Sequence, residues 1–268
     1  MISRRKGEKM AEANVESKDY KLAVLIDGDN AQASLLAKML AEIAKHGPVT
    51  IRRIYGDWTT SNMHSWKDAL HLHAVQPIQQ FRYTVGKNAT DSALIIDAMD
   101  IMHRKLVEGF CIVSSDSDYT RLATRIREEG FFVMGIGQKK TPKSFVNACD
   151  LFIYTENLAP RRENKPRQET AGDKEKGRGS SKKVEAQQQY ASSDPMPLLR
   201  EAYEMVVQEN GWANLGPMGK ALLQLDPGFD PRSYGQRQLS SLLKSLPDFE
   251  LRRSDEHSQT GVWVRLKE

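Results

Sequence analysis

Aspartates recur at three places where a short apolar segment gives way to polar residues and a helix. They lie in the segments LAVLIDGDN (residues 22–30), NATDSALIID (88–97) and FCIVSSDSDY (110–119). Carboxylates are the ligands that Mg²⁺ and Mn²⁺ prefer, and such ions can activate water and neutralise charge that builds on a phosphate. The pattern therefore predicts a divalent-metal site for the cleavage of phosphodiester bonds.

Two of the three clusters are expected at the carboxyl ends of buried strands. The run LAVLI is short, partly β-branched and bounded by Gly28, which predicts a strand ending at Asp27. The run FCIV predicts a second strand, followed by Ser115, Asp116 and Asp118 at the start of a helix. Ligands bind outside the carboxyl ends of the strands in open parallel α/β sheets, so these side chains can converge there.

The third cluster is expected at the start of a helix. Thr90 is a candidate N-cap for an amphipathic helix that runs to about residue 106, which places Asp91 in the first turn, where the helix dipole favours a carboxylate. Asp97 follows six residues later, about 9 Å along the helix and roughly 240° around it, so it is not expected to be a direct ligand.

Each of these residues also has a structural interpretation. An Asp or Ser before a helix is commonly only an N-cap, which applies to Ser115 as well. Asn30 either caps the next helix or orients water or phosphate. Asp29 points away from Asp27 if the strand continues. Lys87 could contact a scissile phosphate as a point charge, or it could be a solvated loop lysine. Three acidic clusters together still favour a cation, because neighbouring carboxylates raise one another's pKa.

The segment from Tyr20 to Leu158 resembles the NYN branch of the PIN-like metal-dependent nucleases, which includes LabA-like proteins. The matching segments, in order, are IDGDN, GKNATD with a later Asp97, VSSDSDY, FFVMGIG and SFVNACDLFIY. The resemblance implies a Rossmann-like three-layer α/β/α fold with a central parallel sheet and a Mg²⁺ or Mn²⁺ site used to cleave RNA. By position, it implies an acidic metal site supported by Asn30, and the metal ligands would be Asp27, Asp91, Asp116 and Asp118.

Composition predicts two folded parts joined by a polar linker. Residues 160–194 are rich in Lys, Arg, Glu, Gln, Gly and Ser and nearly free of large apolar residues, which is typical of a flexible linker. Residues 1–19 have the character of a charged, disordered tail. The expected domains are therefore residues 20–159 and 195–268. The linker stretch 160–190 holds nine basic and five acidic residues, so it could add salt-sensitive affinity for RNA phosphates or act as a solubilising spacer.

The second part is expected to be a small winged helix. Residues 196–210 form an amphipathic pattern, residues 216–225 and 234–246 predict two more helices, and FELRR and VWVRL predict a hairpin. The stretch resembles the OST-HTH, or LOTUS, domain, which implies binding of RNA or of a protein partner. Candidate RNA contacts are Arg232, Tyr234, Arg237, Lys244, Arg252, Arg253 and Trp263, although Tyr234 and Trp263 could instead be core residues.

Other functional classes lack support in the sequence. The two cysteines, Cys111 and Cys149, have the setting of core residues, and there is no Gly-rich phosphate loop of the ATP-binding kind. Nothing resembles a signal peptide or a membrane span, which makes a cytoplasmic protein the expectation. A homodimer is left open. The sequence therefore predicts a metal-dependent RNA endonuclease, with an inactive RNA-binding adaptor or a protein-interaction scaffold as the alternatives.

Overall fold

A six-stranded parallel sheet forms the centre of the first domain in a computed structural model of the chain. The structure describes residues 20–81, 89–159, 194–254 and 261–267. The strand order is β3-β2-β1-β4-β5-β6, and every neighbouring pair is parallel. The strands are β1 (Leu22–Asp27), β2 (Val49–Gly56), β3 (Gln76–Gln79), β4 (Gly109–Val113), β5 (Phe132–Gly137) and β6 (Leu151–Tyr154).

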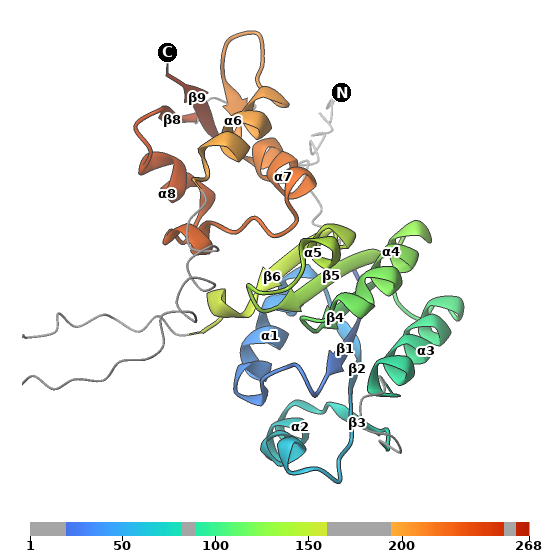
Figure 1. Ribbon diagram of the computed structural model, residues 1–268. Helices are drawn as coiled ribbons and strands as arrows, with labels where there is room; N and C mark the ends of the chain where they lie inside the picture. Colours follow the sequence, from blue (N-terminus) through green and yellow to red (C-terminus); the bar gives the residue numbers. More distant parts are fainter. Residues whose placement is uncertain (1–19, 82–88, 160–193, 255–260, 268) are drawn as a thin grey trace, which may run out of the picture.

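Helices cover both faces of this sheet, which confirms the predicted three-layer α/β/α fold (Figure 1). One face packs against α1 (Leu36–Ile43), η3 (Ser61–Trp66) and α2 (Lys67–His73). The other packs against α3 (Ala89–His103), α4 (Thr120–Glu128) and α5 (Lys143–Ala148). Short 3-10 turns complete the domain: η1 (Ala33–Leu35), η2 (Ala44–His46), η4 (Ser117–Tyr119) and η5 (Thr155–Asn157). Strands β1 and β4 are buried on both faces, which explains their continuous apolar runs.

The topology fixes where a site can form. Strand β1 pairs with β2 on one side and with β4 on the other. The strands β2 and β3 extend the sheet to one side of β1, and β4, β5 and β6 extend it to the other. Side chains at the carboxyl ends of β1 and β4 therefore border the crevice at this switch point, where open α/β sheets bind ligands.

The second domain is a small winged helix, as the sequence predicts. Its helices are α6 (Met196–Glu204), α7 (Leu215–Leu225) and α8 (Leu239–Lys244), and η6 (Pro231–Tyr234) lies between the last two. They pack against an antiparallel sheet of order β7-β9-β8, formed by β7 (Ala213–Asn214), β8 (Phe249–Ser254) and β9 (Gly261–Leu266). The core includes Leu199, Met218, Leu222, Leu243 and Val264, all fully buried.

Several predicted helix limits are wrong in detail. Residues 196–210 are helical only to Glu204, because the chain then turns back: the Gln208 N–H donates to the Trp212 carbonyl and the Tyr203 hydroxyl to the Gly211 carbonyl. The helix predicted over residues 234–246 begins only at Leu239, after Gly235 takes a left-handed conformation with φ of 85°. Thr90 lies inside α3 and is buried, and its hydroxyl has no hydrogen-bond partner in the described part of the chain, so it is not an N-cap.

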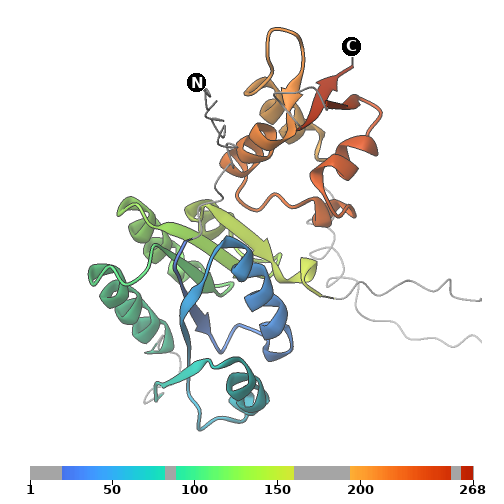
Figure 2. The ribbon, with the colours of Figure 1, turned by 180° about the vertical axis from the view of Figure 1, so that it is seen from behind.

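The second domain packs against the β6 edge of the first (Figures 1 and 2). The Phe152 backbone N–H on β6 donates to the Pro227 carbonyl at 2.7 Å, which satisfies part of an otherwise exposed strand edge. A side chain added at Gly228 would approach the Tyr154 hydroxyl to 2.7 Å, so the loop contacts β6 closely. Three side-chain pairs also join the domains: Arg232 with Glu42, Asn157 with Ser233, and Lys143 with Asp226.

No helix within the described ranges is both long enough and apolar enough to cross a membrane.

Candidate acidic site at the carboxyl edge of the sheet

Asp27 is the most deeply buried carboxylate of the site, with none of its surface exposed. It ends β1, and its oxygens accept hydrogen bonds from Asn30 Nδ2 at 2.7 Å, Ser114 Oγ at 2.8 Å and the Asp29 backbone N–H at 3.1 Å. Burial raises the pKa of Asp27, the bonds from Asn30 and Ser114 oppose this, and the charge of Asp91 raises it further. Three donors thus hold a buried carboxylate that is otherwise costly to charge.

Gly28 lets the chain turn directly after this carboxylate. A side chain here would lie 2.6 Å from the Met63 methyl group and 2.8 Å from the Tyr55 carbonyl oxygen. No residue with a Cβ fits without a shift, because one of these contacts is with backbone on the neighbouring strand. The strand ends at Asp27, so the condition under which Asp29 was expected to point away is not met, and the turn brings the Asp29 backbone N–H back to the Asp27 carboxylate.

The end of β4 is tied to the end of β1 through Ser114. Its hydroxyl donates to Asp27 and accepts the Asp116 backbone N–H at 3.1 Å. The Asp116 carboxylate in turn caps η4 by accepting the Asp118 backbone N–H at 3.0 Å. The structural interpretation of Asp116 as a cap is therefore correct, and its charge also raises the pKa of Asp91. The Ser115 hydroxyl accepts from Gln138 N–H at the end of β5, so the structure directs it away from this chain of bonds.

Helix α3 brings Asp91 to the same crevice. Asp91 lies in the first turn, as expected, and accepts a hydrogen bond of 2.6 Å from the hydroxyl of Tyr119, which is fully buried. Burial raises the pKa of Asp91 most, the Tyr119 bond opposes it, and the charges of Asp116, Asp118 and Asp29 raise it again. Asp27, Asp29, Asp91, Asp116 and Asp118 therefore share one region of negative potential.

The donor set fits a hard divalent cation in its chemistry, because it consists of carboxylate oxygens whose mutual repulsion a cation would relieve. In the described ranges, however, no three His, Cys, Asp or Glu side chains lie close enough together to hold an ion. The reason is visible in the hydrogen bonds: Asp27 is bonded to Asn30 and Ser114, and Asp91 to Tyr119. The side chains of the site would have to draw closer to bind an ion.

Asp97 has a different role. On α3, its carboxylate accepts bonds of 2.8 Å from both Arg53 Nη1 and the Tyr55 hydroxyl on β2. Tyr55 pairs with Asp27 across the sheet, so this contact fixes the helix that carries Asp91 to the strand beside the site.

Sequence reasoning gave too little weight to three residues that the structure places here. They are Asp29, whose backbone N–H donates to Asp27, Ser114, which donates to Asp27, and Tyr119, which donates to Asp91. The short spacing in DGDN and SSDSDY is the only signal that could have identified them. Lys87, a predicted phosphate contact, lies outside the described residues.

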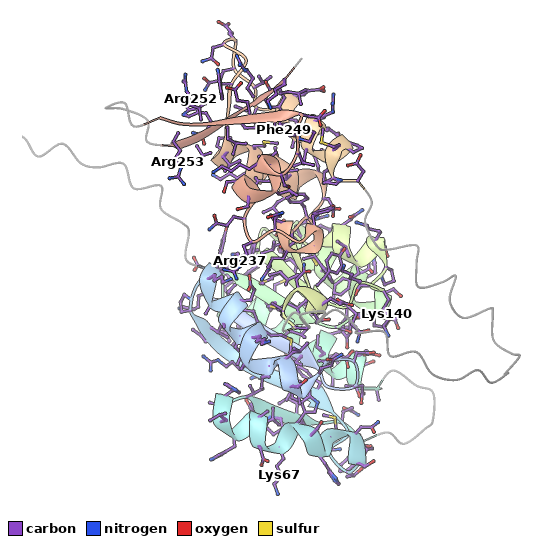
Figure 3. All side chains as sticks on the ribbon, turned by 90° about the vertical axis from the view of Figure 1, so that its left-hand side faces the viewer. Lys67, Lys140, Arg237, Phe249, Arg252 and Arg253 are labelled. Atoms are coloured by element: carbon purple, nitrogen blue, oxygen red, sulfur yellow. The ribbon has the colours of Figure 1, made fainter. Side chains whose placement is uncertain are left out.

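The candidate RNA contacts of the second domain divide into two groups, of which Arg232, Tyr234 and Arg237 lie toward the first domain. Arg232 forms ion pairs with Glu42 and Asp230, which satisfy its guanidinium within the domain interface and do not favour a phosphate there. Tyr234 packs 5.8 Å from Phe229, ring centre to ring centre, against the core. Arg237 is exposed near the boundary between the two domains (Figure 3).

The predicted contacts Arg252 and Arg253 belong to a basic and aromatic surface on the winged sheet. The guanidinium groups of Arg252 on β8 and Arg265 on β9 each lie 4.9 Å from the Trp212 ring centre. Arg252 and Arg253 are exposed on the part of this domain that faces away from the first domain (Figure 3). Trp263 is only 7% exposed, which favours its alternative as a packing residue.

Comparison with known proteins supports both parts of the fold. The model of the NYN domain family matches residues 21–156, and that of the OST-HTH/LOTUS domain family matches residues 188–260. No curated protein matches the sequence.

Two solved structures are similar to parts of the chain. A protein of unknown function from Vibrio parahaemolyticus is 17% identical with a TM-score of 0.44, and the match covers 53% of this chain and 94% of that one. An uncharacterized protein from Nitrosomonas europaea is 32% identical with a TM-score of 0.27, and the match covers 35% of this chain and 93% of that one.

Proposed function

Because the chain belongs to the NYN domain family and carries an OST-HTH/LOTUS domain, we propose that it is a metal-dependent ribonuclease. The first domain hydrolyses RNA phosphodiester bonds, and the second recruits the RNA or a protein partner. The observation that carries this proposal is the convergence of five aspartates at the switch point of the parallel sheet: the charge of Asp91 raises the pKa of Asp27, and the pKa of Asp91 is raised by the other three, Asp29, Asp116 and Asp118.

Asp27, Asp91, Asp116 and Asp118 would hold Mg²⁺ or Mn²⁺, which when bound supplies an activated water and neutralises charge on the phosphate. Asn30 and Ser114 donate to the Asp27 oxygens and so oppose the rise in its pKa on burial, and Tyr119 does the same for Asp91. These donors thus fix two carboxylates in place, while Asp118 and Asp29 are exposed at the rim, where a phosphate would approach.

The second domain would supply affinity through its winged sheet. Arg252 and Arg265 beside Trp212 offer cations and an aromatic ring to a single strand, and Arg253 is exposed next to them. This surface replaces Arg232 and Tyr234 as the proposed RNA contact of the domain, because both of those residues are committed elsewhere.

The test is cleavage of labelled single-stranded and structured RNA by the full chain in Mn²⁺, in Mg²⁺ and in EDTA. We expect cleavage that requires a divalent ion and that falls by at least about a hundredfold in Asp116→Asn, because the charge of a ligand is lost. Asp100→Asn is the matched control, since Asp100 is exposed on α3 outside the cluster. Equal cleavage by parent and Asp116→Asn would overturn the proposal and identify a contaminant.

A second candidate is an RNA-binding adaptor without turnover. It is favoured by one observation, the absence of a closely grouped set of three ligands in the described part of the chain. This candidate predicts RNA binding that weakens as salt rises, with no cleavage under any metal condition. A protein-interaction scaffold predicts neither RNA binding nor RNA cleavage. Measuring both on the same protein therefore distinguishes the three candidate functions.

A further inference from the structure

A large pocket opens on the face of the sheet opposite α3 and α4. It has a volume of about 800 Å³ and lies between β3 and the η3–α2 segment. Its walls include the Trp58 indole, the apolar side chains of Met63 and Val75, and the polar groups of His64, Lys67 and His71. Pockets of this size with an apolar wall and a few polar groups are typical sites for small ligands or parts of larger ones.

The Trp58 ring is held in a fixed position. Its indole Nε1–H donates to the Ile78 carbonyl at 3.0 Å, and its backbone N–H donates to Gln79 Oε1 at 3.0 Å. Both partners belong to the edge strand β3, so the ring is anchored to the sheet. An aromatic wall that is ordered in advance costs little entropy when a flat ligand stacks on it.

The buried side chain of Met63 lies between the pocket and the acidic site. This residue lines the pocket, and its methyl group would lie 2.6 Å from a side chain at Gly28, the residue directly after Asp27. Trp58 itself follows the end of β2, where Tyr55 pairs with Asp27. A single strand bound along the carboxyl edge of the sheet could therefore reach from the aspartates, past the ends of β1 and β2, to the Trp58 wall of the pocket.

The charge of the pocket suits a nucleic acid and contrasts with the acidic site. Lys67 and two histidines line it, and no carboxylate does so among the described residues. Lys67 is exposed and extends from the body of the domain (Figure 3). A phosphate beside the pocket would meet a cation, while a base inside it would meet indole and apolar groups.

We propose that this pocket is a base-binding subsite, which takes a nucleobase of the single-stranded RNA whose scissile phosphate lies at the aspartates. The inference rests on the proposed function for the identity of the strand. It adds that substrate choice depends on Trp58, Lys67 and the two histidines as well as on the winged sheet.

The experiment measures binding in EDTA, so that it is independent of cleavage. The probes are fluorescein-labelled single strands of about ten nucleotides, made of adenosine, of uridine or of abasic residues, at two salt concentrations. Trp58→Leu should weaken adenosine-strand binding about tenfold, the value of one lost base stack, and should leave abasic-strand binding within about twofold.

Lysine variants give the matched control. Lys67→Ala should weaken both kinds of strand and lower the salt dependence by about one phosphate contact. Lys38→Ala should change neither, because Lys38 is an exposed helix lysine on the same face of the sheet that does not line the pocket. A photo-cross-link from a thiouridine strand to a peptide within residues 57–75 of the unaltered chain would support the assignment without any variant.

Two results would overturn the inference: adenosine-strand binding unchanged in a folded Trp58→Leu chain, or an equal loss of binding on abasic strands. Either can occur while Asp116-dependent cleavage stands, which would leave the proposed function intact. Conversely, base-dependent binding through Trp58 in a chain that never cleaves would support the subsite and refute the nuclease.

Discussion

Ser114 joins the two strand ends that carry the carboxylates, since it donates to Asp27 and accepts the Asp116 N–H. Ser114→Ala leaves a fully buried carboxylate with one donor fewer, so we expect a loss of about 1–3 kcal/mol in the free energy of unfolding. Urea unfolding measures it. Ser117→Ala, exposed in the following turn, should stay within about 0.5 kcal/mol of the parent. Equal losses would mean that the Asp27 bond contributes nothing.

Repulsion among the carboxylates should lower the stability of the chain when no metal is bound. The charge of Asp116 raises the pKa of Asp91, so Asp116→Asn should raise the melting temperature of the metal-free chain. Mn²⁺ should then stabilise the parent, by about 2.7 kcal/mol at a hundredfold excess over the dissociation constant, and stabilise the variant much less. Scanning calorimetry with and without EDTA, with Asp100→Asn as control, tests this. Equal stabilisation of all three chains would argue against an ion at Asp116.

The sequence predicted the positions of the carboxylates better than their partners. Asp27 and Asp116 could be placed at the carboxyl edge of the sheet because the end of a buried apolar run marks the end of a parallel strand. The strand ends at Asp27 as predicted, but the hydrogen bond from the Asp29 N–H back to Asp27 depends on the turn that follows, which the apolar pattern does not specify. The contact of Tyr119 with Asp91 depends on the packing of α4 against α3, which joins residues far apart in the sequence.

Asp97 holds α3 to β2 and so acts at the scale of elements. It accepts bonds from Arg53 and Tyr55, and all three side chains lie outside the carboxylate cluster. Asp97→Ala should cost about 1–3 kcal/mol in the free energy of unfolding, because two donors lose their acceptor. It should also reduce cleavage through displacement of Asp91, with more effect on turnover than on RNA affinity. Asp100→Ala is the matched control on the same helix, and an unchanged stability of Asp97→Ala would refute the anchoring role.

Ala74 ends α2 in the left-handed conformation, with φ of 50° and ψ of 48°. A side chain strains this conformation, so Ala74→Gly should stabilise the domain by up to about 1 kcal/mol. Ala37→Gly, in an exposed right-handed helix position on α1, should instead destabilise it by about 1 kcal/mol. Thermal unfolding should therefore show a higher melting temperature for Ala74→Gly and a lower one for Ala37→Gly. If both variants lose stability, the alanine at position 74 is not strained.

Helix existence was easier to predict than helix extent. The pattern of α3 was recognised although its outer face carries the exposed Ile96, because Asp91 and the buried Leu94 and Ala98 keep helical spacing. The ends depended on tertiary contacts: Thr90 is buried within the helix, and α6 stops early because the Tyr203 hydroxyl bonds the Gly211 carbonyl across the returning loop.

At the scale of the whole molecule, the contact between the domains had no signal in the sequence. Arg232 was expected to bind phosphate because it is a basic residue in a domain associated with RNA. The structure pairs it with Glu42, which lies 190 positions earlier in the sequence. The spacing of apolar residues in the sequence identifies the core of each domain. It does not identify contacts between the two domain surfaces, because these depend on the shape and charge of both surfaces.

This pairing makes docking of the domains sensitive to acid. Burial favours protonation of Glu42, yet hydrogen bonds and charges from Lys45 and Arg232 hold its pKa below the ordinary value of 4.5. A carboxylate with a lowered pKa stabilises the docked state fully above its ordinary pKa, and the contribution is lost as pH falls through the lowered value. The two domains should therefore separate, while each stays folded, as the pH falls below about 4.5.

Small-angle scattering between about pH 6 and pH 3.5 measures this separation as a rise in the radius of gyration, with circular dichroism to show that both domains remain folded. Glu42→Gln removes the titrating group, so its radius should be larger than that of the parent at pH 6 and should not change across the window. Lys45→Ala should keep the transition of the parent, because Arg232 still reaches Glu42. A parent radius that stays constant down to pH 3.5 would mean that the β6 contact with Pro227 holds the domains together without this ion pair.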